Sequence, residues 1–122
     1  MIFSFFSGSG FLDLGFERAG FDVVFVNEID KSFINAYEHS RQLMGHSQPK
    51  YGYHTGSIED YLEERDECSL AKSVKSEQAN GKLVGFVGGP PCPDFSVGGK
   101  NKGQEGENGK LSQSYIDCIK KF

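Results

Sequence analysis

One cysteine of this chain lies in a setting that suits chemistry. The run G-G-P-P-C-P-D-F-S, residues 88–96, follows directly on the apolar segment Leu83 to Val87. Glycine lets the backbone turn sharply and approach a ligand closely, whereas proline restricts φ and removes an amide donor. This turn would hold the Cys92 thiol in one place, as a nucleophile requires. A buried, inert thiol is the usual role of a cysteine and remains the alternative.

A glycine turn, Gly8-Ser9-Gly10, follows the first apolar run of the chain. Such a turn, with the free amides of a following helix, could bind a nucleotide-like cofactor. Position 13 is aspartate, so the third glycine of the dinucleotide fingerprint is absent, and a purely structural turn remains open. Glu28 favours the cofactor role, because it ends the second predicted strand, where a carboxylate could accept hydrogen bonds from ribose hydroxyls.

Two further groups of polar residues have two interpretations each. Ser57-Ile58 follows a possible third strand, and strand ends line the ligand crevice of parallel sheets, although helix capping is the commoner role of such a serine. Lys100, Lys102 and Lys110 lie in or beside a glycine-rich loop. They are either a solvated surface or part of a loop that closes over a ligand and contacts phosphate.

Strand and helix patterns alternate along the chain. Apolar runs predict strands at 2–6, 21–26, 51–55 and 83–87, and helical spacing predicts helices at 12–19, 31–44 and 111–122. Asp30 can cap the second of these helices. The polar segment 59–80 predicts a short helix near Tyr61 and then a solvated loop or a second helix, and residues 98–109 predict a loop. This alternation indicates an α/β fold with a largely parallel sheet, and its few strands indicate the N-terminal half of a doubly wound sheet.

Length and composition limit the possible classes of protein. A chain of 122 residues, 37% hydrophobic and 25% charged, is typical of one globular domain. No apolar run approaches the roughly 20 residues that span a bilayer, and no signal peptide is recognisable, so we expect an intracellular protein. Three cysteines without C-x-x-C spacing argue against a disulfide framework or a zinc site. A net charge of −4 gives no general attraction to nucleic acid.

Together these motifs resemble the cytosine-5 DNA methyltransferase family. F-S-G-S-G at residues 6–10 resembles the first motif of the family, Glu28 resembles its ribose-binding acid, and residues 89–96 resemble its nucleophile motif. Residues 99–103 resemble the mobile loop that follows, and residues 109–111 resemble the start of the next motif. The nucleophile motif is highly specific, whereas the glycine motif is shared by many cofactor-binding folds. The likeness covers nearly the whole chain apart from its polar middle.

The resemblance implies a Rossmann-like sheet and methyl transfer from S-adenosylmethionine to carbon 5 of cytosine. Cys92 would add to carbon 6 of a cytosine flipped out of duplex DNA, so that carbon 5 can take the methyl group. The cofactor-binding residues that it implies are Phe6, Ser7, Gly8, Ser9, Gly10, Phe11, Glu28, Ile29, Ser57, Ile58, Pro91 and Leu111. The implied DNA-contacting loop residues are Ser96, Lys100 and Lys102, and no metal is expected.

The chain also departs from the family pattern. Ser57 stands where the family usually has an aspartate that bonds the adenine amino group. The later glutamate, the arginine-bearing motif and the target-recognition domain of the family have no counterpart in residues 1–122, so we expect these residues alone to be inactive. The expected setting is bacterial or phage restriction-modification, in the cytoplasm near the nucleoid, with a monomeric full-length enzyme. The alternatives are a tRNA cytosine-5 methyltransferase, a non-catalytic cofactor-binding module and a nicotinamide-dependent oxidoreductase.

Overall fold

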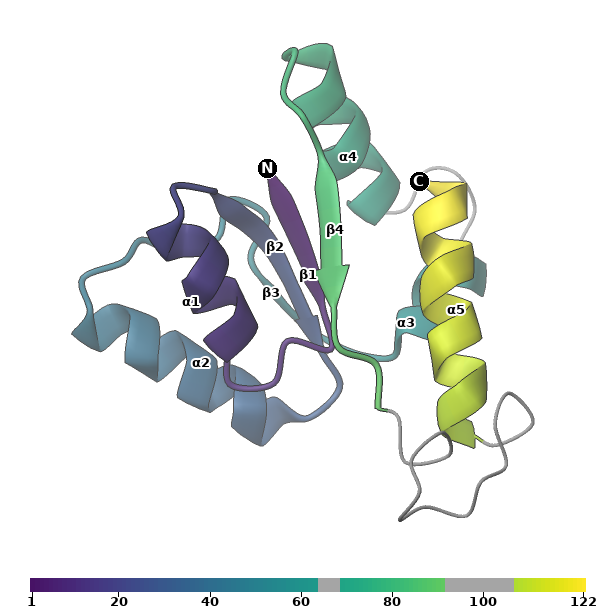
Figure 1. The fold of residues 1–122 in the computed structure, drawn as a ribbon, viewed down its shortest axis with the longest axis horizontal. Helices are drawn as coiled ribbons and strands as arrows, with labels where there is room; N and C mark the ends of the chain where they lie inside the picture. Colours follow the sequence, from purple (N-terminus) through teal and green to yellow (C-terminus); the bar gives the residue numbers. More distant parts are fainter. Residues whose placement is uncertain (64–68, 92–106) are drawn as a thin grey trace.

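Strands and helices alternate along the chain, as predicted. The computed structural model describes residues 1–63, 69–91 and 107–122 (Figure 1). In chain order the elements are β1 (Ile2–Phe5), α1 (Phe11–Arg18), β2 (Val23–Glu28), α2 (Lys31–Leu43), β3 (Tyr53–Thr55), α3 (Ile58–Glu63), α4 (Ser69–Ala79), β4 (Gly85–Gly88) and α5 (Glu107–Lys121). Asp30 caps α2 by accepting a hydrogen bond from the Ser32 amide at 2.8 Å, which confirms its predicted role.

The four described strands form one parallel sheet in the order β3-β2-β1-β4. Helices α1 and α2 contribute Phe16, Ile34 and Tyr37 to one hydrophobic cluster with β1 and β2, while α3, α4 and α5 contribute to a second. The elements form a sheet with helices on both faces (Figure 1). This confirms the predicted α/β class, and it brings the carboxyl ends of all four strands to the same edge.

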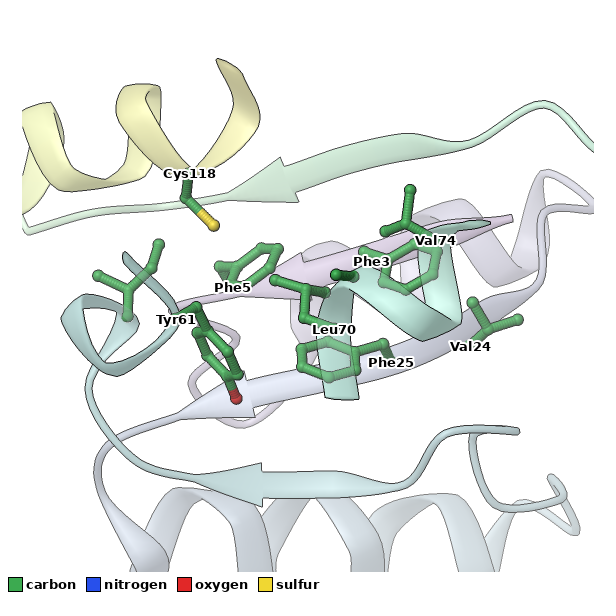
Figure 2. Close-up of a cluster of buried hydrophobic side chains, with 10 residues drawn as sticks. Phe3, Phe5, Val24, Phe25, Tyr61, Leu70, Val74 and Cys118 are labelled. Atoms are coloured by element: carbon green, nitrogen blue, oxygen red, sulfur yellow. The ribbon is translucent and has the colours of Figure 1, made fainter. Parts of the chain in front are cut away.

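The larger cluster is built on aromatic side chains of the central strands (Figure 2). Phe3, Phe5 and Phe25 have no exposed surface, and the centroids of the Phe3 and Phe5 rings lie 5.7 and 5.6 Å from that of Phe25. Leu70 and Val74 of α4 pack against these rings. Large apolar rings bury much surface per residue, so a short sheet obtains a substantial core from few positions.

The structure confirms the short helix predicted near Tyr61, as α3, and the second helix predicted as one alternative for the rest of segment 59–80, as α4, which buries one face in the core. Leu70, Ala71 and Val74 are buried, and Glu77 of the same helix is only 2% exposed. The Glu77 carboxylate accepts hydrogen bonds from Lys50 Nζ at 2.5 Å and from the Tyr51 hydroxyl at 2.6 Å. A charged side chain can be buried when it is paired in this way, and the sequence pattern alone does not reveal the pairing.

Two predicted boundaries were wrong. Residue Leu83, assigned to a buried strand, is 87% exposed, and β4 begins at Gly85. Pairing with β1 begins at Ile2 and Gly85, so Leu83 precedes the paired part of the strand, where its carbonyl accepts from the Met1 ammonium at 2.7 Å. Residues 107–109, predicted as loop, form the first turn of α5.

Candidate cofactor site

A cavity of about 250 Å³ opens at the carboxyl edge of the sheet. Its lining comes from the ends of β1, β2 and β3 and from the segments around β4 and α5. The lining residues are Phe6, Asn27, Glu28, Ile29, Gly56, Ser57, Ile58, Gly89, Pro91 and Leu111. In parallel α/β sheets this edge is where ligands bind.

The cavity unites many of the predicted cofactor residues and leaves others outside its wall. Those that line it are Phe6, Glu28, Ile29, Ser57, Ile58, Pro91 and Leu111. Those that do not are Ser7, Gly8, Ser9, Gly10 and Phe11. Phe11 is 82% exposed at the start of α1. Sequence reasoning missed Asn27 and Gly56, each the chain neighbour of a residue that it identified, whereas Gly89 belongs to the motif at residues 89–96 but was not assigned to cofactor binding.

Glu28 is the acidic group of the cavity, and its carboxylate is held from two sides. Oε2 accepts from the Gly8 amide at 2.8 Å, and Oε1 accepts from the Asp30 amide at 3.1 Å. Each carboxylate oxygen can accept a second hydrogen bond, so both retain capacity for a ligand hydroxyl. The hydrogen bond from the Gly8 amide to Glu28 links the glycine turn to the cavity, although the turn does not line the cavity.

Phe6 has a backbone conformation that residues other than glycine rarely adopt. Its φ is 51°, directly after β1 ends at Phe5. The ring lies edge-on to that of Tyr115 on α5, with centroids 6.0 Å apart. Burial raises the pKa of Tyr115 to about 12, so this phenol stays neutral at physiological pH. Backbone strain of this kind is concentrated at functional sites, and here it belongs to a residue of the cavity wall.

Asn27 joins the end of β2 to the end of β3 and the residue that follows it. Its Nδ2 donates to the carbonyls of His54 at 3.3 Å and Gly56 at 3.1 Å. Asn27 is 3% exposed, and with Glu28 it ends a strand whose other residues are apolar. A buried amide in such a run is the signal that could have identified this residue, because a buried polar group needs partners.

Ser57 both caps a helix and lines the cavity. Its Oγ accepts from the Glu59 amide at 3.2 Å, while Asp60 Oδ2 accepts from the Ser57 amide at 3.1 Å. This reciprocal arrangement is a capping box for the short helix α3. The helix-capping interpretation of Ser57 is therefore confirmed, and its place in the cavity wall leaves a contact with a ligand as a prediction.

The glycine turn depends on a close contact at Gly10. The φ of Gly10 is 85°, and a Cβ atom there would lie 2.5 Å from two ring carbons of Tyr37. Gly10 precedes α1 without any side-chain cap, so the first amides of that helix have no side-chain acceptor at the cap position. The turn is therefore restricted to glycine at this position by sterics as well as by backbone conformation.

Comparison with known proteins identifies the family. The sequence model of the C-5 cytosine-specific DNA methylase family matches residues 1–122. The chain belongs to this family. Over 119 residues it is 61% identical to the type II methyltransferase M.NmeDI of Neisseria meningitidis serogroup C. It is 33% identical to M.MthTI of Methanothermobacter thermautotrophicus and 34% identical to M.FnuDI of Fusobacterium nucleatum. These alignments cover 98% of this chain and 28 or 29% of each relative, so the chain spans less than a third of their length.

Several residues expected of a cytosine-5 methylase lie outside the described part of the structure. They are the predicted nucleophile Cys92 and the predicted DNA-contacting residues Ser96, Lys100 and Lys102. Cys68 lies outside it too, whereas Cys118 is buried in the larger hydrophobic cluster. Within residues 1–63, 69–91 and 107–122, no group of three or more potential ligands could hold a metal ion, and no helix could cross a membrane.

Proposed function

We propose that this chain is the N-terminal part of the catalytic domain of an S-adenosylmethionine-dependent DNA cytosine-5 methyltransferase. The observation that carries the proposal is the cavity, which gathers residues predicted for cofactor binding from five separate segments of the chain. Membership of the methylase family and the printed names of the relatives support it, among them the DNA (cytosine-5-)-methyltransferase M.ApeKI of Aeropyrum pernix, 32% identical over 122 residues.

The cavity wall suits the nucleoside half of the cofactor. Glu28 can accept hydrogen bonds from ribose hydroxyls, because two backbone amides already fix its carboxylate. Ile29, Ile58 and Leu111 offer apolar surface for a purine ring. S-adenosylmethionine, when bound, supplies the methyl group as an electrophile. The residues of this chain would hold it at the carboxyl edge of the sheet.

The nucleophile of the proposed reaction follows the cavity wall directly in the chain. Pro91 lines the cavity, and Cys92 is the next residue. The Cys92 thiolate would form a bond to carbon 6 of a flipped cytosine, and the electron pair of the 5,6 double bond would then form the carbon–methyl bond at carbon 5 while the methyl–sulfur bond of the donor breaks and S-adenosylhomocysteine leaves. Loss of the carbon 5 proton restores the double bond and expels the thiolate. Ser96, Lys100 and Lys102 would contact the DNA.

Calorimetry tests the cofactor site. We expect the chain to bind S-adenosylhomocysteine and to ignore NAD, because the third glycine of the dinucleotide fingerprint is replaced by a buried aspartate. Glu28→Gln should weaken binding about tenfold or more, since its amide nitrogen cannot accept the hydrogen bonds that the carboxylate accepts. Glu59→Gln, on the exposed surface of α3, is the matched control and should bind normally. Preferential binding of NAD would refute the proposal.

Covalent trapping tests the reaction and separates its alternatives. DNA containing 5-fluorocytosine should form an adduct at Cys92 in a full-length protein, because fluorine at carbon 5 blocks the final elimination. Adduct formation with tRNA in place of DNA would favour the tRNA methyltransferase, and no adduct with either would favour a binding module. The 122 residues alone should transfer no labelled methyl group above background. We place the activity in a bacterial restriction-modification system, in the cytoplasm at the nucleoid.

A further inference from the structure

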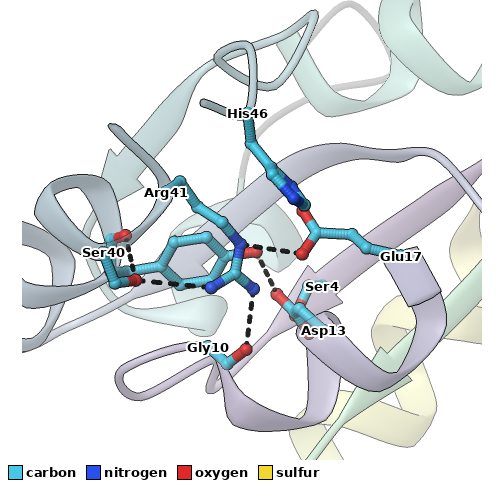
Figure 3. A network of polar contacts seen from close by, with 8 residues as sticks. Ser4, Gly10, Asp13, Glu17, Ser40, Arg41 and His46 are labelled. Carbon is cyan, nitrogen blue, oxygen red and sulfur yellow. Dashed lines mark hydrogen bonds and ion pairs between the residues drawn. The ribbon is translucent and has the colours of Figure 1, made fainter. Parts of the chain in front are cut away.

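A buried polar cluster of Ser4, Asp13, Tyr37 and Arg41 lies next to the glycine turn, and none of its residues lines the cavity (Figure 3). The carboxylate of Asp13 has no exposed surface and accepts from Ser4 Oγ at 2.7 Å and from the Tyr37 hydroxyl at 2.8 Å. Burial raises the pKa of Asp13, and the two hydroxyl donors oppose that rise. Both carboxylate oxygens are therefore used by the protein itself.

Arg41 connects this cluster to the turn. The guanidinium is 3% exposed and its Nη2 donates to the carbonyl of Gly10 at 2.8 Å, while Nε donates to Glu17 at 2.7 Å. Its central carbon lies 4.4 Å from the centre of the Tyr37 ring. Apolar side chains could fill this space without the desolvation cost of buried charges. What they could not do is bind the Gly10 carbonyl and so fix the orientation of that peptide group.

The turn is anchored at both ends. At its far end Arg41 donates to the Gly10 carbonyl, which restricts rotation of that peptide group. The Tyr37 ring packs against Gly10, which restricts movement of Gly10 towards the ring. Within the turn the Gly10 amide donates to the Ser7 carbonyl at 3.0 Å. At its near end the Gly8 amide donates to Glu28 in the cavity wall. A displacement of Gly10 would therefore be transmitted to the acid of the proposed cofactor site.

We propose that Asp13, Tyr37 and Arg41 are positioning residues for the cofactor, which act by fixing the glycine turn against Glu28. They touch no ligand themselves. Asp13 orients the Tyr37 hydroxyl, Tyr37 sets the depth of Gly10, and Arg41 sets the direction of its carbonyl. The inference rests on the proposed cofactor site.

Two tyrosines provide a matched test. Tyr37→Phe keeps the ring under Gly10 and removes the hydroxyl that binds Asp13. Tyr51→Phe removes a hydroxyl that binds another buried carboxylate, that of Glu77, from a residue that does not line the cavity. Both variants lose one hydrogen bond to a buried acid, so both should lose similar stability. Only Tyr37→Phe should weaken binding of S-adenosylhomocysteine, by about tenfold, while Tyr51→Phe stays within about twofold of the parent chain.

The outcomes separate this inference from the function on which it rests. Equal affinities for the two variants would assign Tyr37 a purely structural role and overturn the inference, with the proposed function intact. A parent chain that binds no S-adenosylhomocysteine would overturn both. If Tyr37→Phe does not fold by circular dichroism, Arg41→Lys replaces it, because lysine keeps the charge but has no fork of donors to span Gly10 and Glu17. The same about tenfold loss is expected, and unchanged affinity would again refute the inference.

Discussion

Gly10 and Gly20 have nearly the same backbone conformation, with φ angles of 85° and 87°, but different surroundings. A Cβ atom at Gly10 would lie 2.5 Å from two ring carbons of Tyr37, whereas one at Gly20 would meet no atom within 4 Å. Gly10→Ala and Gly20→Ala therefore impose the same backbone penalty, and only the first imposes a steric clash. The pair separates the two costs experimentally.

The magnitudes follow from these geometries. Alanine in the left-handed region costs about 1–2 kcal/mol, which is the whole effect expected for Gly20→Ala. Overpacking at a close contact adds about 1–3 kcal/mol, so Gly10→Ala should reduce the free energy of unfolding by about 2–5 kcal/mol. A domain of this size has only about 5–15 kcal/mol in total, so the difference between the two variants is readily measured.

Urea unfolding followed by circular dichroism is the appropriate assay. Gly10→Ala should also abolish most binding of S-adenosylhomocysteine, while Gly20→Ala should bind as the parent chain does. Replacing Tyr37 by leucine removes the aromatic ring, so the extra cost of Gly10→Ala should largely disappear in that background. If both alanine variants lose the same stability in the parent chain, a side chain at position 10 does not clash with Tyr37, and the predicted steric cost is refuted.

Three other predictions concern the core, the ion pair of the buried Glu77 with Lys50, and the cavity. Leu70→Ala should destabilise the fold by about 3–5 kcal/mol, because the side chain is fully buried, whereas Leu83→Ala at an 87% exposed position should change stability by less than about 0.5 kcal/mol in urea unfolding. Hydrogen bonds from Lys50 and Tyr51 lower the pKa of Glu77 below its usual 4.5. The stability from this pairing is therefore present above pH 4.5 and lost as the pH falls through the lower pKa of the folded state. Glu77→Gln should be less stable at pH 7 and lose less on acidification to pH 3. Ser57→Asp should strengthen binding of S-adenosylhomocysteine several-fold but not of its inosine analogue, which lacks the adenine amino group; equal gains would contradict this.

The local features of this fold could be predicted from the sequence. Runs of apolar residues predicted β1 and β2 to within a few residues, and Asp30 was correctly predicted to cap α2. The motifs at residues 6–10 and 89–96, with Glu28, indicated the family that the comparison confirmed. These features can be predicted because a strand pattern, a helix cap or a motif depends on residues close together in the chain.

Features that join distant segments were decided by the tertiary structure alone. Asp13, at the third position of the dinucleotide fingerprint, can be buried because Ser4 and Tyr37 supply donors for its carboxylate. Asn27 lies in the cavity wall, and its side chain donates hydrogen bonds to the carbonyls of His54 and Gly56, about 30 residues further along the chain. Glu77 is buried in α4, where Lys50 and Tyr51 from another segment supply its partners. In each case a polar side chain is buried because its partner arrives from another element, and hydrophobic periodicity carries no information about that partner.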